Sequence, residues 1–183
     1  MHDSVFATIA EEAQRESPLW GLVLRAPGEH ELQPIFSELA DARFALAIES
    51  IYEGYLLHYA SPRLFSPEDA DTAVLLGDYL YAHGLVRLTR TGNVSAVAEF
   101  AELISLCAQL RAEARPGDGV AWAATSVLLG ADDRRLAGAL AALRLEHDPS
   151  PLGVLAETVA DQELLVGALA AHAARLQPAE TSV

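Results

Sequence analysis

The sequence has no lysine: all 12 of its basic residues are arginine, set against 26 aspartate and glutamate residues. The formal net charge at pH 7 is therefore −14. Nucleic acids and anionic membranes are polyanions, and proteins bind them through clusters of basic side chains. A chain this acidic offers no basic cluster of that kind, which argues against both as partners.

Cysteine and long apolar runs are also scarce. Cys107 is the single cysteine, which excludes an internal disulfide and suits a reducing compartment. It lies in the apolar run EFAELISLCAQL with no histidine nearby, so we interpret it as a buried packing residue. No run of 18 apolar residues occurs, and MHDSVFATIAEEAQ lacks the basic region of a signal peptide. We therefore expect a cytoplasmic protein without an integral membrane segment.

Residues that favour strands are sparse, whereas alanine, the best helix former, makes up much of the 51% hydrophobic fraction. We predict an all-α fold in a single domain over residues 1–183, ending in a disordered tail at about 178–183. The candidate caps Ser66, Asn93 and Asp132 or Asp133, together with the prolines, predict seven or eight helices. Their expected ranges are 4–17, 18–24, 34–59 with a break near Asp41, 66–90, 93–113, 122–129, 132–147 and 160–176. PGDG, residues 116–119, and HDPSPLG, residues 147–153, are expected to be loops.

Metal-ligand patterns are weak in this sequence. The six histidines are scattered, and none lies three or four residues from another, so an all-protein zinc site is not expected. Glu146-His147-Asp148 sits at a helix exit, and Asp132-Asp133 opens a helix, where aspartate is a favoured cap. We interpret both groups as helix ends, and we predict no metal and no cofactor bound by this chain alone.

The segment ESIYEGYLLHYASPR, residues 49–63, concentrates tyrosine and glutamate on one predicted helix that Pro62 ends. Residues three and four apart share a helix face, which groups several of these side chains in one stripe. The candidate ligand-pocket residues are Glu49, Tyr52, Tyr55, Leu56 and Tyr59. The alternative is that the tyrosines pack in the core with their hydroxyls at its edge.

The run LLGDYL, Leu75–Leu80, and the helix that follows it resemble the middle of the trans-type polyprenyl diphosphate synthases. In that family a Leu-x-Gly-Asp-Tyr-Leu-like core follows the first aspartate-rich motif. Gly77 at this place permits close approach of another helix, and a mid-helix Asp78 needs a buried partner.

The resemblance continues upstream of this core. AIESIYEGYLLHYASPR aligns without a gap to the segment that carries the family's first aspartate-rich motif, with matching types at Glu49, Ile51, Leu56, Leu57 and His58. Tyr59, Ala60 and Arg63 then occupy the places of its three aspartates. Gly28, Leu32 and Pro34 match the family's Gly-Gly-Lys-Arg-Leu-Arg-Pro, whereas His30, Glu31 and Gln33 replace its basic residues.

The resemblance covers residues 28 to 115 and implies a truncated helical bundle of the isoprenoid synthase type. Family catalysis uses magnesium held by the aspartates, and basic residues hold a second diphosphate. Both sets are replaced here, and no acidic repeat matches the second aspartate-rich motif. The resemblance therefore implies a non-catalytic small subunit that supports the activity and chain-length control of a catalytic partner synthase. Magnesium diphosphate would enter only through that partner.

In the family's dimers the Gly-Asp helix and the next helix contribute much of the interface. The resemblance thus makes partner-contact candidates of Asp78, Tyr79, Tyr81, Leu85, Phe100 and Leu103, with packing in the chain's own core as the alternative for each. A homodimer stays open.

A second hypothesis is a stand-alone module that binds a prenyl chain or another apolar ligand among the tyrosines. A third, an enzyme using Glu49, Glu53 and His58, is disfavoured because nothing opposite them binds a leaving group.

Overall fold

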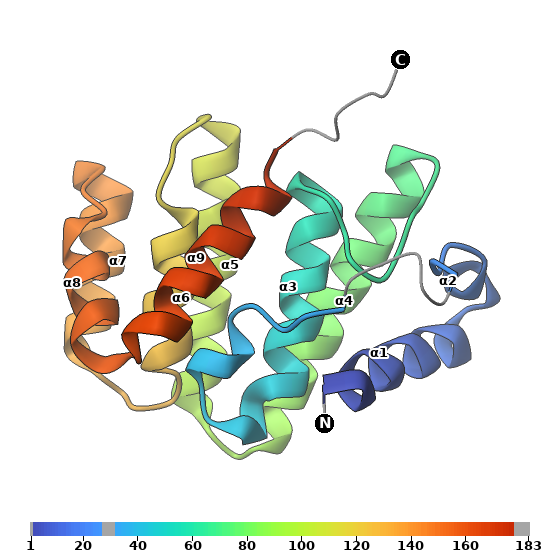
Figure 1. Ribbon diagram of the computed structural model, residues 1–183, viewed down its shortest axis with the longest axis horizontal. Helices are drawn as coiled ribbons and strands as arrows, with labels where there is room; N and C mark the ends of the chain where they lie inside the picture. Colours follow the sequence, from blue (N-terminus) through green and yellow to red (C-terminus); the bar gives the residue numbers. More distant parts are fainter. Residues whose placement is uncertain (1, 27–31, 178–183) are drawn as a thin grey trace.

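The computed structural model describes residues 2–26 and 32–177, and the regular elements of these residues are all helical (Figure 1). The predicted all-α class is confirmed for them. The α-helices are α1 (His2–Glu16), α2 (Pro18–Leu22), α3 (Ala45–Tyr59), α4 (Ala70–Arg90), α5 (Val94–Ala112), α6 (Asp118–Val127), α7 (Arg134–Glu146), α8 (Ser150–Val159) and α9 (Gln162–Arg175), with 3-10 turns η1 (Ser37–Leu39) and η2 (Ala42–Phe44). The predicted tail at 178–183 and the motif residues Gly28, His30 and Glu31 lie outside the described residues.

Helix α3 is the centre of the fold, because every residue from Ala47 to Leu57 is buried. Helix α4 packs along α3, and Gly54, Gly77 and Gly84 allow the two helix backbones to approach closely. A Cβ at Gly77 would lie 2.6 Å from Nε2 of His58, and one at Gly54 would lie 2.9 Å from the carbonyl oxygen of Gly77. The close approach expected at Gly77 is therefore confirmed.

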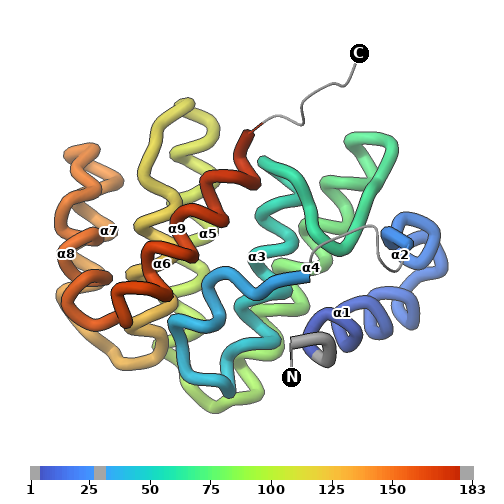
Figure 2. The backbone as a smooth tube through the Cα atoms, in the orientation of Figure 1, coloured from blue at the N-terminus to red at the C-terminus, as the bar shows by residue number. Residues whose placement is uncertain are grey.

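Two apolar clusters hold the helices together. The larger one surrounds the fully buried Trp122 of α6 and joins α3 and α5 to the helices of the C-terminal half. The smaller one, which includes Ile9, Leu76 and Leu80, fixes α1 against α3 and α4. The backbone trace shows the consequence: the α7–α8 pair forms one end of the molecule, α1 and α2 form the other, and α9 crosses in front (Figure 2).

Several predicted boundaries were wrong. Helix α8 begins inside the segment HDPSPLG, residues 147–153, which was expected to be a loop, because proline at the first turn of a helix is tolerated where its missing N–H would have no partner. Residues 34–44 contain 3-10 turns, not α-helix, and the Asp41 carboxylate caps η2 by accepting from the N–H of Arg43 at 3.0 Å. None of the described helices is long and apolar enough to cross a membrane.

The helix caps were predicted in part. Asn93 and Asp133 cap α5 and α7 as expected, each accepting a backbone N–H from the first turn. Ser66, the predicted cap of α4, is replaced by Asp69, whose carboxylate accepts from the N–H of Thr72 at 2.8 Å. Helix α6 begins at Asp118, inside the expected PGDG loop.

Candidate functional site

Glu49, Glu53 and Arg63 form an ionic cluster in which all three side chains have no exposed surface. Glu49 and Glu53 lie one turn apart on α3, and Arg63 enters from the loop after it. Nη1 of Arg63 donates to Oε2 of Glu49 at 2.6 Å, and its Nε donates to Oε2 of Glu53 at 3.1 Å. We name this the Arg63 cluster.

The remaining carboxylate oxygens of the Arg63 cluster are occupied by backbone amides. Oε1 of Glu53 accepts from the N–H groups of Arg63 at 2.8 Å and Leu64 at 2.7 Å, and Oε1 of Glu49 accepts from Ile35 and Ser37 at 3.2 and 3.3 Å. The guanidinium also lies over the rings of Phe6 and Tyr52. Burial alone would lower the pKa of Arg63, but the two glutamates raise it. The cluster therefore cross-links α3 to both flanking loops.

A second polar network lies further along α3. The Tyr55 hydroxyl donates to Oδ2 of Asp118, and Arg111 donates to the same hydroxyl oxygen at 2.7 Å and forms an ion pair with Asp118. On α9, Nε2 of His172 is 3.7 Å from Oδ2 of Asp118, and its Nδ1 is 2.9 Å from the Tyr52 hydroxyl. The network joins α3, α5, α6 and α9.

Burial and charge act in opposite directions at Asp118. Burial would raise its pKa, but the neighbouring His172, the hydrogen bond from Tyr55 and the charge of Arg111 hold the pKa far below its usual value. Burial raises the pKa values of Tyr52 and Tyr55 far above the usual range, and the charge of Asp118 raises that of Tyr55 further. Both phenols are therefore neutral at physiological pH, and the Tyr55 hydroxyl donates to the carboxylate of Asp118.

The ligand-pocket candidates are placed together, but inside the core. Glu49, Tyr52, Tyr55 and Leu56 have no exposed surface, whereas Tyr59 is partly exposed. Both buried tyrosine rings pack edge-on against Trp122, at centroid distances of 5.0 and 5.7 Å. Side chains of the same chain thus fill the space around them. No group of three or more His, Cys, Asp or Glu residues suited to a metal occurs among residues 2–26 and 32–177.

The polar partners Asp118, Arg111 and His172 were not predicted as site residues. Asp118 is 63 positions from Tyr55, and His172 is 120 positions from Tyr52. Pairings at such separations depend on helix packing, which no local pattern encodes. The sequence did offer one signal for such partners: the tyrosines on the predicted helix 34–59. A tyrosine hydroxyl that is buried in a core needs a hydrogen-bond partner, so polar side chains elsewhere in the chain had to meet these hydroxyls.

The interface candidates divide into exposed and buried residues. Asp78 is 66% exposed and lies 3.2 Å from Nε2 of His58, whose side chain is 12% exposed. Because Asp78 faces solvent, it does not need the buried partner that was expected for it. Tyr79, Tyr81 and Leu85 are half-buried. Phe100 and Leu103 have no exposed surface and pack in the larger core, because they lie on the inner face of α5. Phe100 and Leu103 therefore pack in the chain's own core, as the alternative to a partner contact had it.

Helix α4 presents further apolar side chains to solvent that the sequence comparison did not single out. Leu75 is 60% exposed, Val74 is 47% exposed and Val86 is 44% exposed. Asp78 and Ala82 lie within this stripe, between Leu75 and Val86, and Asp71 lies at its N-terminal end; all three are exposed. We name these six residues the α4 face. Large exposed apolar side chains on one helix face are typical of protein–protein contact surfaces.

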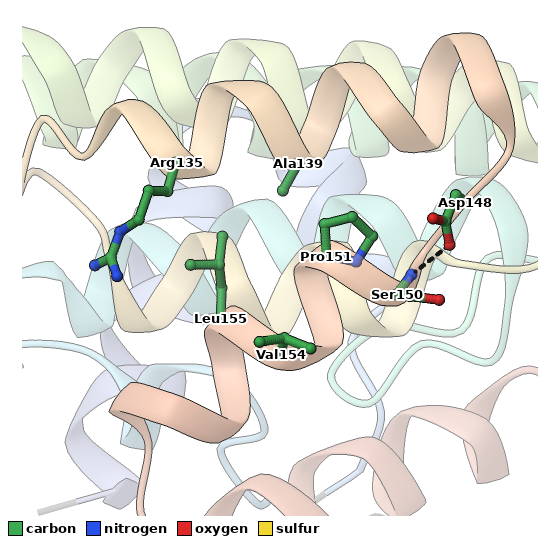
Figure 3. A pocket seen from close by; sticks show the side chains of 7 residues that line it. All are labelled: Arg135, Ala139, Asp148, Ser150, Pro151, Val154 and Leu155. Atoms are coloured by element: carbon green, nitrogen blue, oxygen red, sulfur yellow. Dashed lines mark hydrogen bonds between the residues drawn. The ribbon is translucent and has the colours of Figure 1, made fainter.

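Open pockets lie at other places on the described surface. A groove of about 430 Å³ separates α7 from α8, with Ala139, Pro151 and Leu155 along it and Arg135 and Asp148 near opposite ends (Figure 3). A mainly apolar pocket of about 570 Å³ lies beside Val5, Leu46 and Leu164, and a polar pocket of about 280 Å³ lies between α1 and α4.

Comparisons with known proteins found no matching family model, no matching curated protein and no matching solved structure.

Proposed function

We propose that this chain is a non-catalytic helical subunit that binds a catalytic polyprenyl diphosphate synthase and supports its activity and chain-length control. The observation that carries the non-catalytic part is the Arg63 cluster. It lies on the helix that resembles the magnesium-binding helix of the family, and Arg63 stands in the place of its third aspartate. A truncated isoprenoid-synthase-type bundle and a cytoplasmic location belong to the same proposal.

The chemistry of the Arg63 cluster favours a structural role for α3. A magnesium–diphosphate site needs carboxylate oxygens that face an open cavity and are free to bind the metal. In the Arg63 cluster, the glutamate oxygens accept hydrogen bonds from a guanidinium and from backbone amides. A buried arginine also repels a divalent cation. The helix therefore contributes stability and shape, and any prenyl transfer would occur in the partner.

The α4 face supports the binding part of the proposal. It combines Val74, Leu75 and Val86 with the exposed acids Asp71 and Asp78. A complementary partner surface would be an apolar helix face with basic residues at its rim, because opposite charges at an interface rim favour association. The partly exposed Tyr81 and Leu85 would extend the contact along the same helix.

Co-expression with a polyprenyl diphosphate synthase from the same genome tests this proposal. We expect a stoichiometric complex on size-exclusion chromatography and a change in the product chain length of the synthase. Leu75→Arg should abolish the complex while the isolated chain stays folded, because the position is exposed. Val166→Arg is the matched control, since Val166 is 56% exposed on α9, away from the α4 face.

Two results would contradict the proposal: no complex with the synthase, or equal loss of the complex in both variants.

A second candidate function, storage or transport of an apolar ligand, is favoured by the mainly apolar pocket of about 570 Å³ beside Leu46 and Leu164. Extraction of the chain purified without a synthase distinguishes the two, since a stoichiometric bound lipid and no protein partner would support the ligand function.

A further inference from the structure

The polar pocket between α1 and α4 combines basic side chains with an aromatic wall. Its volume is about 280 Å³, and its lining is Glu12, Arg15, Glu16, Tyr79, His83 and Arg90. We propose that this pocket binds a small oxyanion, a metabolite that carries a phosphate or carboxylate group, between Arg15 and Arg90. The proposal is independent of the function proposed above, because it uses the side of α4 that faces α1.

The two arginines are available to a ligand. Within the described residues, neither Arg15 nor Arg90 has a carboxylate within ion-pair distance, although the protein has more than twice as many acids as arginines. The buried Arg63 and Arg87 and the partly buried Arg111, by contrast, each form an ion pair with an acid. Two unpaired guanidinium groups lining one pocket match the planar, two-pronged geometry that binds phosphate and carboxylate.

The charge of Glu12 at the base of this pocket is compensated inside the protein. Its Oε2 accepts from Nη2 of Arg87, Nη1 of the same guanidinium donates to the Ser50 hydroxyl, and Nδ1 of His83 is 3.5 Å from the Glu12 oxygen. Glu16 is exposed at the pocket edge. Counting Arg15, Arg87 and Arg90 against Glu12 and Glu16, the surroundings carry a net positive charge within a strongly acidic protein.

His83 and Tyr79 form the aromatic wall, with parallel rings 5.1 Å apart. Burial lowers the pKa of His83, the charges of Arg87 and Arg90 lower it further, and Glu12 and Glu16 oppose this effect. An anion held next to His83 would stabilise the imidazolium and raise that pKa. Binding would then take up a proton, so the affinity should increase as the pH falls through the titration of His83.

The pocket volume limits the ligand to a small molecule. It lies just below the usual range for ligand pockets, which begins at about 300 Å³. A phosphorylated or carboxylated metabolite of a few carbon atoms fits this size, with its anionic group at the arginines and its carbon atoms along the Tyr79 and His83 rings. The overall negative charge of the protein argues against a nucleic acid as the ligand.

Isothermal titration calorimetry of the full chain at constant ionic strength tests the site, with inorganic phosphate, glycerol 3-phosphate and neutral glycerol as probes. We expect saturable binding of at least one phosphate probe and none of glycerol. Arg15→Ala and Arg90→Ala should each weaken binding by about tenfold or more, the effect of losing one charge-assisted contact. Arg134→Ala on α7 is the control that removes the same charge elsewhere, and it should leave the affinity unchanged.

NMR titration of His83 gives a second readout that a structural role would not produce. The pKa of its imidazole should rise when the phosphate probe is added to the wild type, and should not respond to the probe in the Arg15→Ala/Arg90→Ala double variant. The proposal is overturned if neither phosphate probe saturates, if Arg134→Ala loses as much affinity as the pocket variants, or if the pKa of His83 is unaffected by a saturating probe.

Discussion

Arg63 is a guanidinium with no exposed surface, and it compensates two glutamates that have no other basic partner among the described side chains. Its net contribution to stability is smaller than the strength of its contacts, because all three charged groups lose their hydration on folding. Its removal is a different matter, since two carboxylates would then remain buried without a counter-charge. This asymmetry makes Arg63 the most informative single substitution in the core.

We predict that Arg63→Met lowers the free energy of unfolding by about 3–5 kcal/mol, the typical loss when one partner of a buried pair is removed. Urea unfolding followed by circular dichroism measures this change. Arg43→Met is the matched control: Arg43 is 56% exposed and pairs with Asp41, so the loss there should be below about 1 kcal/mol. Equal losses in the two variants would contradict the structural role of the Arg63 cluster.

A second residue-scale prediction concerns pH and Asp118. Its pKa in the folded chain lies below 3.8, the usual pKa of an aspartate side chain. Its contribution to stability is therefore present at neutral pH and is lost as the pH falls below about 4, where the unfolded chain takes up a proton and the folded chain does not. Asp118→Asn should be less stable than the wild type at pH 7, with a smaller loss of stability between about pH 5 and pH 3.

Urea midpoints at a series of pH values measure the effect of Asp118. Glu146→Gln provides the control, because Glu146 is an exposed carboxylate at the end of α7 and its removal should leave the pH dependence nearly unchanged. If Asp118→Asn keeps the full acid sensitivity of the wild type, another carboxylate controls the acid response.

At the scale of elements, the packing of α3 on α4 depends on missing side chains. The backbones approach closely at Gly54, Gly77 and Gly84, where a Cβ would meet atoms of the facing helix. At Gly84, that Cβ would overlap Cγ1 of Ile51 and lie 3.1 Å from the carbonyl oxygen of Ala47. Neither group can move without shifting α3 itself, whose side chains are buried on all sides.

We predict that Gly84→Ala lowers the free energy of unfolding by about 1–3 kcal/mol, because overpacking outweighs the gain in helix propensity. Gly138→Ala should act in the opposite direction and raise it by about 0.5–1 kcal/mol, since a Cβ there meets nothing within 4 Å and alanine favours helix. Thermal and urea unfolding of both variants measure the difference. A gain in stability from Gly84→Ala would show that the two helices are packed less closely.

The elements show what the sequence could predict. Local signals identified the helical class, the caps Asn93 and Asp133, and the close approach at Gly77. The partner of Glu49 and Glu53 was not identified, because Arg63 becomes their neighbour only when the loop after α3 folds back. Helix α8 was missed because its two prolines, Pro149 and Pro151, resemble a loop when helix N-terminal geometry is unknown.

At the scale of the whole molecule, charge balance opposes folding at low salt. The net charge is −14, and the arginines that form buried ion pairs are not available to neutralise surface acids. Exposed carboxylates therefore repel one another across the surface, and this repulsion is weaker in the more expanded unfolded chain. Salt reduces it, because the screening length falls from about 30 Å at 0.01 M to about 8 Å at 0.15 M ionic strength.

We predict that the melting temperature rises when sodium chloride is increased from about 0.01 M to about 0.15 M. The Arg63 cluster and the Asp118 network should lose little over this range, because screening acts weakly on pairs that are removed from solvent. Differential scanning calorimetry at fixed pH measures the shift, and potassium chloride should reproduce it if general screening is the cause. A melting temperature that falls with salt would mean that exposed ion pairs, such as Arg144 with Glu102, outweigh the repulsion between surface acids.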